Sequence, residues 1–258
     1  MIDIHSHILF GLDDGADSMT EGLAMAKQAV QDGVQVIYAT PHHLHPQFEY
    51  HQDELYHNFN EFNTQLIKEG IPLEVRIGQE IRLSGDLVEQ LNSKEALTLG
   101  NDRKYVLIEF PSDHVPEYAQ RLLFDVQVAG YQPIIAHPER NKEIMQKPEL
   151  LYKLVRDGSL AQLTAASVAG KFGKKIQEFS FDLIEANLIH FVASDAHNTN
   201  TRGFVLTHAW ENIRKEFGLE TVYYLRENAE ILADHGQVIS DEPLRIKQKK
   251  KKKIFKFF

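Results

Sequence analysis

The chain has 258 residues, of which 43% are hydrophobic, 10% are aromatic and none is cysteine. This composition supports a folded core of one or two domains. It excludes disulfides, thiolate metal sites and catalysis by a cysteine nucleophile. The 28 basic and 37 acidic residues give a net charge of −9, which argues against a general nucleic-acid-binding protein.

The charge is unevenly distributed. Residues 245–258 hold eight Lys or Arg and no acid, which leaves 20 basic and 37 acidic residues in 1–244. We expect residues 1–244 to form one domain and residues 245–258 a basic, aromatic tail. The chain start lacks the basic segment and apolar run of a signal peptide, and no stretch approaches the roughly 18 apolar residues of a membrane span. We therefore expect a soluble cytoplasmic protein.

Short apolar, β-branched segments alternate with helical patterns along the chain. Seven such segments with intervening helices favour an α/β fold with a mainly parallel sheet, and the length suits a closed (β/α) barrel. The expected strands, in chain order, are residues 2–5, 34–39, 73–77, 105–110, 133–136, 160–163 and 189–193.

Two helices are well marked between the first three strands. Ser18 is a good N-cap, Glu21 three residues later completes a capping box, and Gly33 ends this helix. Its expected inner face holds Leu23, Ala26 and Val30. Residues 52–69 form the second helix, whose apolar positions at helical spacing predict core contacts. These positions are Leu55, Phe59, Phe62 and Leu66.

Nine potential metal ligands follow these strands or lie late in them. The carboxyl ends of barrel strands meet at one mouth, so we expect these side chains to converge. Any one of them could instead be a hydrogen-bonded core group, a helix cap or an ion-pair partner. Burying all of them together without cations would cost several kcal/mol per unpaired charge, so the sequence predicts two or three bound metal ions. The ligands are His5, His7, Asp14, His42, Glu80, Glu109, His137, Asp195 and His197.

Imidazole and carboxylate ligands without thiolate suit Mn, Fe or Zn. Arg140 and Arg202 lie near the same mouth and suit phosphate oxygens, although either could pair with neighbouring acids such as Glu139. His43 and His45 lie beside the mouth and could touch substrate. We expect the remaining histidines to be surface or helix residues: His51, His57, His114, His190, His208 and His235.

These motifs resemble those of the polymerase-and-histidinol-phosphatase (PHP) family. Within it, residues 1–235 are most similar to the bacterial manganese-dependent tyrosine-protein phosphatases that accompany capsule and exopolysaccharide genes. Phe10 stands where proline is expected and Ala166 where glycine or serine is common, which affects only the substrate rim. The motifs that carry the resemblance are residues 3–9, 13–15, 39–43, 78–80, 108–110, 136–140 and 193–197.

The resemblance implies a distorted seven-stranded (β/α) barrel and three Mn²⁺ ions, with Fe or Zn possible. It implies phosphate binding by Arg140 and Arg202. By the same resemblance, one ion is held by His5, His7, Glu80 and Asp195, a second by Glu80, Glu109 and His137, and a third by Asp14, His42 and His197.

The implied reaction is hydrolysis of phosphotyrosine by metal-activated water, without a covalent intermediate. Water or His43 could protonate the leaving group. The implied substrate is the tyrosine cluster of a membrane-associated autophosphorylating kinase. Residues 245–258 are either a solubilising end or a segment that docks on an anionic membrane. Two alternative functions remain: hydrolysis of a small phosphate ester such as histidinol phosphate, and a non-catalytic regulator stabilised by metal.

Overall fold

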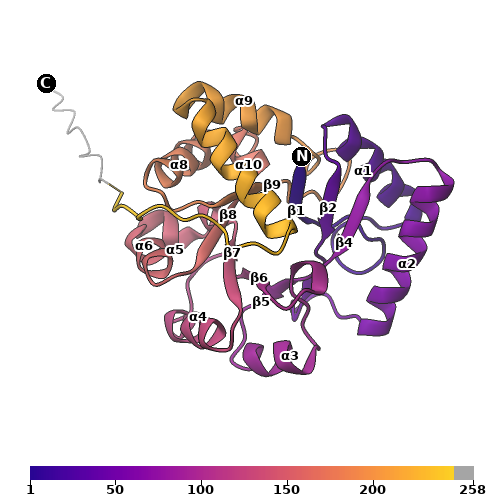
Figure 1. Cartoon of the computed structure of the whole chain (residues 1–258), viewed down its shortest axis with the longest axis horizontal. Helices are drawn as coiled ribbons and strands as arrows, with labels where there is room; N and C mark the ends of the chain where they lie inside the picture. Colours follow the sequence, from indigo (N-terminus) through magenta and orange to yellow (C-terminus); the bar gives the residue numbers. More distant parts are fainter. Residues whose placement is uncertain (247–258) are drawn as a thin grey trace, which may run out of the picture.

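The structure is a computed structural model that describes residues 1–246 of the chain (Figure 1). Every pairing between the strands of this part of the chain is parallel. The strands are β1 (Ile2–Ser6), β2 (Val36–Ala39), β3 (His42–His43), β4 (Glu74–Ile77), β5 (Glu80–Arg82), β6 (Tyr105–Glu109), β7 (Gln132–Ala136), β8 (Leu160–Thr164) and β9 (Phe191–Ala193).

All seven strands expected from the sequence are present, and their ends differ from the expected ones by no more than two residues. The short strands β3 and β5 were not expected. Thr40 and Pro41 separate β2 from β3, and Gly78 and Gln79 separate β4 from β5. Two of the expected strands are therefore each followed, after a two-residue break, by a short strand that begins with a candidate ligand.

The strands form two sheets, one in the order β1-β2-β4 and the other in the order β3-β5-β6-β7-β8-β9. An isolated bridge pairs Ser6 with Ala196, and the Asp195 amide donates to the His5 carbonyl at 2.9 Å, so β1 also lies beside the segment that follows β9. The fold is α/β with parallel sheets. A single closed seven-stranded barrel is not confirmed, because the hydrogen-bonded ladder is divided into three and six strands.

Helices surround the strands on the outside (Figure 1). None of those within residues 1–246 is long and apolar enough to cross a membrane. They are α1 (Met19–Gln31), α2 (Gln52–Lys68), α3 (Leu87–Ser93), α4 (Ala119–Val128), α5 (Lys142–Gln146), α6 (Glu149–Arg156), α7 (Ala165–Val168), α8 (Lys174–Glu185), α9 (Leu206–Phe217) and α10 (Leu219–Ala233), with 3₁₀ turns η1 (Leu99–Asn101) and η2 (Pro138–Arg140).

Helix α1 begins as the sequence predicts but turns a different face inward. The Ser18 hydroxyl accepts a hydrogen bond from the Glu21 amide at 3.3 Å, whereas the Glu21 carboxylate accepts from the amide of Asp17 instead of Ser18. The expected capping box is therefore only half formed. Of the expected inner face only Ala26 is fully buried, and the buried residues of this helix are Gly22, Met25, Ala26 and Ala29.

The second marked helix agrees more closely with its apolar pattern. Helix α2 covers Gln52–Lys68, against an expected 52–69, and three of its four expected core positions are buried. Phe59 is only partly buried and packs against the core, while the polar Asn58 is buried beside it. The Asn58 side-chain amide donates to the Phe10 carbonyl at 2.8 Å, which explains why this polar residue occupies an inward position.

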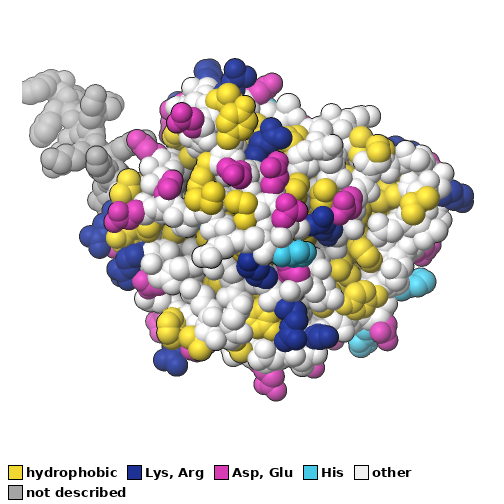
Figure 2. Space-filling view, viewed as in Figure 1, with side chains coloured by type: hydrophobic (Ala, Val, Ile, Leu, Met, Phe, Trp, Pro, Cys, Tyr) yellow, Lys and Arg dark blue, Asp and Glu magenta, His cyan; other side chains and the backbone are white. Residues whose placement is uncertain are grey.

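Residues 237–246, which we call the C-terminal strap, cross the amino ends of the strands (yellow in Figure 1). The Val238 amide donates to the hydroxyl of Tyr105, the first residue of β6, at 3.1 Å. The Leu244 amide donates to the Ala186 carbonyl at 2.8 Å. Figure 2 shows acidic and basic side chains interspersed over this face. The remainder of the predicted tail, residues 247–258, lies outside the described residues.

His190 is not the surface or helix residue that the sequence led us to expect. It is fully buried, its Nδ1 accepts from the Ala161 amide at 3.1 Å, and its Nε2 lies 2.9 Å from the Ser240 hydroxyl of the strap. The sequence could not indicate this, because the burial depends on a segment fifty residues away. The other histidines expected at the surface are exposed: His51, His57, His114, His208 and His235.

Candidate active site

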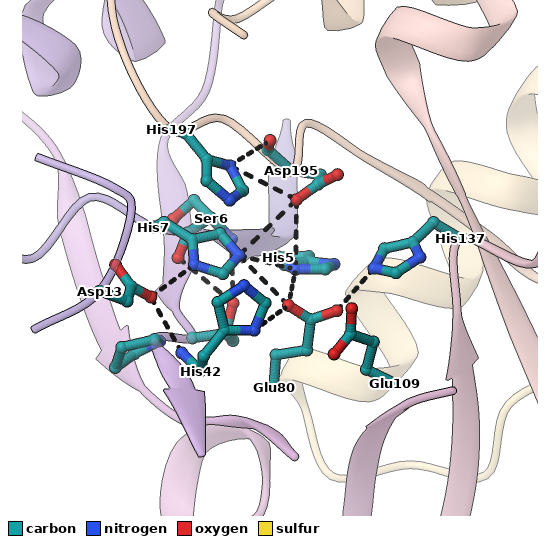
Figure 3. Close-up of polar contacts among 12 residues, drawn as sticks. His5, Ser6, His7, Asp13, His42, Glu80, Glu109, His137, Asp195 and His197 are labelled. Carbon is teal, nitrogen blue, oxygen red and sulfur yellow. Dashed lines mark hydrogen bonds and ion pairs between the residues drawn. The ribbon is translucent and has the colours of Figure 1, made fainter. Parts of the chain in front are cut away.

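The nine predicted metal ligands lie together at the carboxyl ends of the strands, and all except Asp14 are labelled in Figure 3. Parallel strands place residues at their carboxyl ends on one edge, and the short β3 and β5 each begin with one of these side chains. By element, His5 lies in β1, His7 and Asp14 between β1 and α1, His42 in β3, Glu80 in β5, Glu109 at the end of β6, His137 after β7, and Asp195 and His197 after β9.

Glu80 lies at the centre of this group. Its Oε2 is 3.3 Å from the Nε2 atoms of both His5 and His7, and 3.0 Å from His42 Nδ1. Its Oε1 is 2.6 Å from His137 Nε2. One carboxylate therefore faces four imidazoles with its two oxygens, and it is the shared member of this side of the cluster.

Two further carboxylates face the same histidines from other sides. Asp195 Oδ1 is 3.5 Å from His5 Nε2. Asp14 Oδ1 is 3.3 Å from His197 Nε2 and 3.5 Å from His42 Nε2. The ligands thus form two linked clusters, one around Glu80 and one around Asp14.

The donor atoms fit divalent cations. Glu80 Oε2 and His197 Nε2 are buried and have no hydrogen-bond partner within residues 1–246. Buried oxygen and nitrogen atoms that converge with unused lone pairs form an arrangement that a cation satisfies. Three sets of donor atoms each lie within 4.8 Å of one another: His7, Asp14, His42 and His197; His5, His7 and Glu80; and His42, Glu80 and Glu109.

These sets resemble, but do not repeat, the ligand groups that family resemblance implied. His7 lies near the Asp14 set as well as near Glu80, and His42 lies near Glu109. His137 and Asp195 belong to none of the three sets, although His137 contacts Glu80 and Asp195 lies 3.5 Å from His5.

The histidines and carboxylates of this cluster shift one another's pKa values. Burial disfavours the imidazolium form, but Glu80, Asp14 and other nearby carboxylates outweigh it and raise the pKa of His42 to about 11. Burial lowers the pKa of His197 to about 4. Burial alone would raise the pKa of Glu80, yet the surrounding histidines hold it well below its usual value. The pKa values of Asp14 and Asp195 are likewise held below their usual range, chiefly by neighbouring histidines and Arg140, so these carboxylates and Glu80 are ionised at neutral pH and present negative charge to the centre.

Two of the predicted ligands adopt backbone angles that are unusual for residues with a side chain. His137 has φ of 34° and Asp195 has φ of 52°. Each such conformation costs roughly 1–3 kcal/mol and persists where the surrounding structure imposes it, commonly at functional sites. Here the strained turns direct both side chains back over the ends of β7 and β9.

Both predicted phosphate-binding arginines line the same pocket as six of the nine candidate ligands, namely Asp14, His42, Glu80, Glu109, His137 and Asp195. Arg140 Nη2 lies 2.5 Å from Asp195 Oδ2, and Arg202 contacts Asp14 at 3.2 Å and Asp195 at 3.4 Å. The ion pairs considered in the sequence analysis therefore exist, but not with Glu139. The Glu139 Oε1 atom instead accepts hydrogen bonds from the Thr164 amide and the Ser167 hydroxyl.

Two residues that orient ligand histidines were missed by the sequence analysis. Asp13 Oδ2 lies 2.6 Å from His7 Nδ1, and Gln162 Oε1 lies 2.9 Å from His5 Nδ1. A carboxylate or amide oxygen on the second ring nitrogen fixes the tautomer and directs Nε2 to the metal side. Asp13 was visible beside Asp14, but spacing does not reveal which carboxylate faces a ligand. Gln162 lies in β8 and is distant in sequence.

The pocket is about 250 Å³ in volume and has aromatic as well as charged walls. Phe48 and Phe110 line it together with His45. The Phe48 ring stacks on His45 at a centroid distance of 4.9 Å and on His42 at 5.7 Å. His43, considered as a proton donor, is not among the lining residues, whereas His45 is.

The two departures from the family pattern lie away from this pocket. Phe10 is half-buried and packs against the core, and it does not line the pocket. Ala166 is buried in α7 and lines a neighbouring hollow. Neither position contributes a ligand.

Comparison with known proteins identifies the family to which the chain belongs. Residues 1–233 match the family described as capsular polysaccharide synthesis, CpsB/CapC. The chain belongs to the CpsB/CapC family. Its relatives include the tyrosine-protein phosphatase YwqE of Bacillus subtilis (strain 168), with 48% identity over all of both chains, and the putative tyrosine-protein phosphatase CapC of Staphylococcus aureus, with 38% identity over 97% of this chain and 98% of the relative.

Solved structures agree with the CpsB/CapC assignment. One solved structure is 48% identical to this chain and has a TM-score of 0.93 over 96% of this chain and 100% of its own. It is described among crystal structures of YwqE from Bacillus subtilis and CpsB from Streptococcus pneumoniae, which are called metal-dependent tyrosine phosphatases. The histidinol phosphate phosphatase of Lactococcus lactis, 17% identical, has a TM-score of 0.55 over 84% of this chain and 93% of its own. The second likeness shows the fold alone.

Proposed function

We propose that this CpsB/CapC chain is a metal-dependent phosphatase that hydrolyses phosphotyrosine in proteins. One observation carries the proposal: six of the nine candidate ligands and both arginines line a single pocket that also has aromatic walls, and the other three candidates, His5, His7 and His197, are buried against Glu80 and Asp14 of that lining. Cations and arginines suit a phosphoryl group, and Phe48 and Phe110 suit the ring attached to it.

The ligand set would hold three ions, for which Mn²⁺ is the proposed metal and Fe or Zn the competitors. Glu80 would bridge two of these ions, since its two oxygens face different histidines. The first ion would use His5, His7, Glu80 and Asp195, the second Glu80, Glu109 and His137, and the third Asp14, His42 and His197. When bound, such cations supply Lewis-acid activation of water and of the phosphoryl group.

The chain's own side chains bind and orient the substrate. Arg140 and Arg202 approach from the side of Asp195, and their guanidinium groups would bind the phosphoryl oxygens and neutralise charge as the ester bond breaks. The phenol of tyrosine leaves with a pKa near 10, so it needs less protonation than an alkyl alcohol. His45, the histidine on the pocket wall, is better placed than His43 to contact the leaving group.

The proposed substrate is the tyrosine cluster of a membrane-associated, autophosphorylating kinase that controls polysaccharide synthesis, and the proposed location is the cytoplasm. Capsular polysaccharide synthesis is the process named for the family. We also propose that residues 245–258, outside the described residues from 247 on, dock on an anionic membrane surface and bring the enzyme to its kinase.

Two structural proposals accompany this function. Residues 1–244 would be the catalytic unit. Arg245, the first residue of the predicted tail, forms an ion pair with Glu149 and lies over the ring of Tyr152, so the boundary with the tail still contacts this unit. The strands would form a distorted seven-stranded barrel in which β2 with β3, and β4 with β5, each count as one interrupted strand. The bridge between Ser6 and Ala196 supports closure on the remaining side.

The test of the function is hydrolysis of matched substrates after metal removal. We expect chelation to abolish hydrolysis of a phosphotyrosine peptide and Mn²⁺ to restore it better than Zn²⁺, Fe²⁺ or Mg²⁺. His7→Ala and Arg140→Ala should each lose at least about a hundredfold in kcat/KM. Faster turnover of histidinol phosphate than of the peptide would overturn the substrate, and equal activity of all three proteins would overturn the site.

The membrane proposal has a separate test. Deleting residues 245–258 should abolish sedimentation with vesicles that contain anionic lipid, because each lysine near the surface contributes about 1 kcal/mol. Turnover of p-nitrophenyl phosphate should be unchanged. Vesicle binding that survives the deletion would reject the docking role of the tail.

A further inference from the structure

A second hollow of about 740 Å³ lies next to the catalytic pocket and shares Arg202 with it. We call it the flanking hollow. It lies between the carboxyl end of α1, the turn after α7 and the loop after β9. Its polar lining includes Gln28, Gln31, Lys171, Thr199, Asn200 and Thr201.

Phe172 lies between the two spaces. Its ring centroid is 5.7 Å from the Arg140 guanidinium carbon, and the same residue lines the flanking hollow. A substrate whose phosphoryl group reaches Arg140 and Arg202 therefore has this hollow beside it. A p-nitrophenyl group carries no chain beyond its ring, whereas the peptide chain around a phosphotyrosine continues outward from the pocket.

The turn that carries Phe172 and Lys171 is held in a defined shape. Gly170 and Gly173 on either side have φ of 78° and 92°, a region that favours glycine. The Lys171 amide donates to the Ala166 carbonyl at 2.9 Å, and the Gly173 amide donates to the Gly170 carbonyl at 3.1 Å. The backbone thus fixes where these two side chains begin.

The charges around the hollow favour an acidic ligand. Lys171 is exposed and has no salt bridge with any described residue. Asp32, the acid in the lining, is already engaged, since its carboxylate accepts from the Leu206 amide at 2.6 Å and from the Thr207 amide at 3.2 Å. The lining side chains Lys171 and Arg202 against Asp32 give a formal charge of +1. Because Arg202 is paired with Asp14 and Asp195, Lys171 is the cation that a ligand would meet unpaired among the described lining residues, although the chain as a whole carries −9.

We propose that the flanking hollow binds the peptide segment next to the phosphotyrosine, and that Lys171 selects for an Asp or Glu side chain in that segment. This inference rests on the proposed function and deepens it. It also explains how a protein with excess negative charge recognises a phosphopeptide: the attraction is local to one rim.

The test compares three phosphotyrosine peptides in the Mn²⁺-loaded enzyme. One has Glu on the amino-terminal side of the phosphotyrosine, one has Glu on the carboxyl-terminal side, and one has Gln on both sides. We expect one of the Glu peptides to exceed the Gln peptide by about fivefold in kcat/KM, as for a solvent-accessible ion pair. The preference should shrink as salt rises.

Lys171→Gln should remove that preference and leave p-nitrophenyl phosphate turnover unchanged. The matched control is Lys175→Gln, an exposed lysine on α8 with the same change of charge and outside the hollow. Equal loss of preference in both variants would overturn the inference, because it would reflect net charge alone.

A second variant tests occupancy of the hollow independently of charge. Gln31 is exposed at the end of α1 and lines the hollow, so Gln31→Trp should raise KM for the preferred peptide severalfold without changing KM for p-nitrophenyl phosphate. An unchanged peptide KM would reject binding there. A wild-type enzyme that hydrolyses no phosphotyrosine substrate would refute the proposed function itself, whereas equal hydrolysis of all three peptides would refute only this inference.

Discussion

Asp13 lies behind the candidate ligands and contacts several parts of the cluster at once. Its Oδ2 faces His7 Nδ1 at 2.6 Å and accepts from the His42 amide at 2.9 Å, while its Oδ1 accepts from the Gly15 amide at 2.9 Å. One carboxylate thus holds a ligand histidine, the backbone of a second ligand and its own loop.

Replacing this carboxylate by an amide should weaken metal binding more than folding. For Asp13→Asn we expect Mn²⁺ affinity to fall roughly 10–100-fold, because the His7 tautomer is no longer fixed. Calorimetric titration of the chelator-treated protein would measure this. Asp17→Asn, at an exposed position in the same loop, should bind Mn²⁺ as the wild type does. Equal affinities for all three proteins would contradict the orienting role.

The aromatic wall makes a prediction about substrate choice. Phe48→Ala should raise KM for a phosphotyrosine peptide by up to about tenfold, since one aromatic contact contributes roughly 0.5–1.5 kcal/mol beyond area burial. KM for a phosphoserine peptide should change less, because it presents no ring. Phe124→Ala, at an exposed position on α4, is the control. Equal effects on both peptides would assign Phe48 a merely structural role.

At the scale of elements, the sequence predicts long features well and short ones poorly. The seven expected strands are apolar, β-branched runs, and such runs form strands wherever helices can cover both faces. The strands β3 and β5 have only two and three residues, and they begin with His42 and Glu80, so no alternation marks them. These two short strands are defined by their hydrogen bonds to neighbouring strands, since β3 pairs with β5 and β5 pairs with β6.

The candidate ligands themselves could be found from sequence because they are chemically distinctive and follow strand ends. Their precise grouping could not, because it depends on side-chain directions across several connections. The buried face of α1 differs from the expected one for the same reason. Gly22 lies against the Ile8 carbonyl and Phe62, so the backbone of α1 packs closely against these residues on a side of the helix that the apolar pattern of the sequence does not mark.

The loop between β1 and α1 leaves no room for a side chain at Gly15. A Cβ placed there would lie 2.1 Å from the His7 carbonyl oxygen and 2.6 Å from the His7 Cβ. Gly15→Ala must therefore displace backbone beside a ligand, and we expect it to lower the free energy of unfolding by about 3 kcal/mol and to weaken Mn²⁺ binding.

Gly85→Ala is the matched control for this substitution, since a Cβ at Gly85 has no neighbour within 4 Å and its φ is not positive. Urea unfolding of the chelator-treated proteins should place this control within about 0.5 kcal/mol of wild type. A similar result for Gly15→Ala would show that the loop adjusts at little cost.

At the scale of the whole molecule, the C-terminal strap contacts a histidine that is buried in the interior. His190 bonds to Ser240 of the strap, and burial lowers the pKa of this histidine to about 4 from its usual 6.5. In the unfolded chain the imidazole of His190 binds a proton as the pH falls below 6.5, whereas in the folded chain it stays neutral until about pH 4. Stability is complete above this window and is lost as the pH falls through it.

The predicted consequence is a pH-dependent difference between two variants. Between pH 7.5 and pH 5, wild type should lose about 2 kcal/mol of unfolding free energy that His190→Gln does not lose. Denaturant unfolding in the presence of chelator would measure both. His208→Gln, at an exposed position on α9, should lose as much as wild type. If His190→Gln retains the full pH slope, other groups carry it.

The placement of β1 also bears on how the protein is made. The first strand bonds on one side to β2 and on the other to residues 194–196, through the Asp3 carboxylate, the His5 carbonyl and the bridge at Ser6. The ribosome synthesises β1 and β2 early, whereas residues 194–196 emerge only after most of the polypeptide has been made. The candidate ligands can therefore come together only late in biosynthesis, because a nascent chain that stops before residue 194 lacks Asp195 and His197 and the segment that pairs with β1.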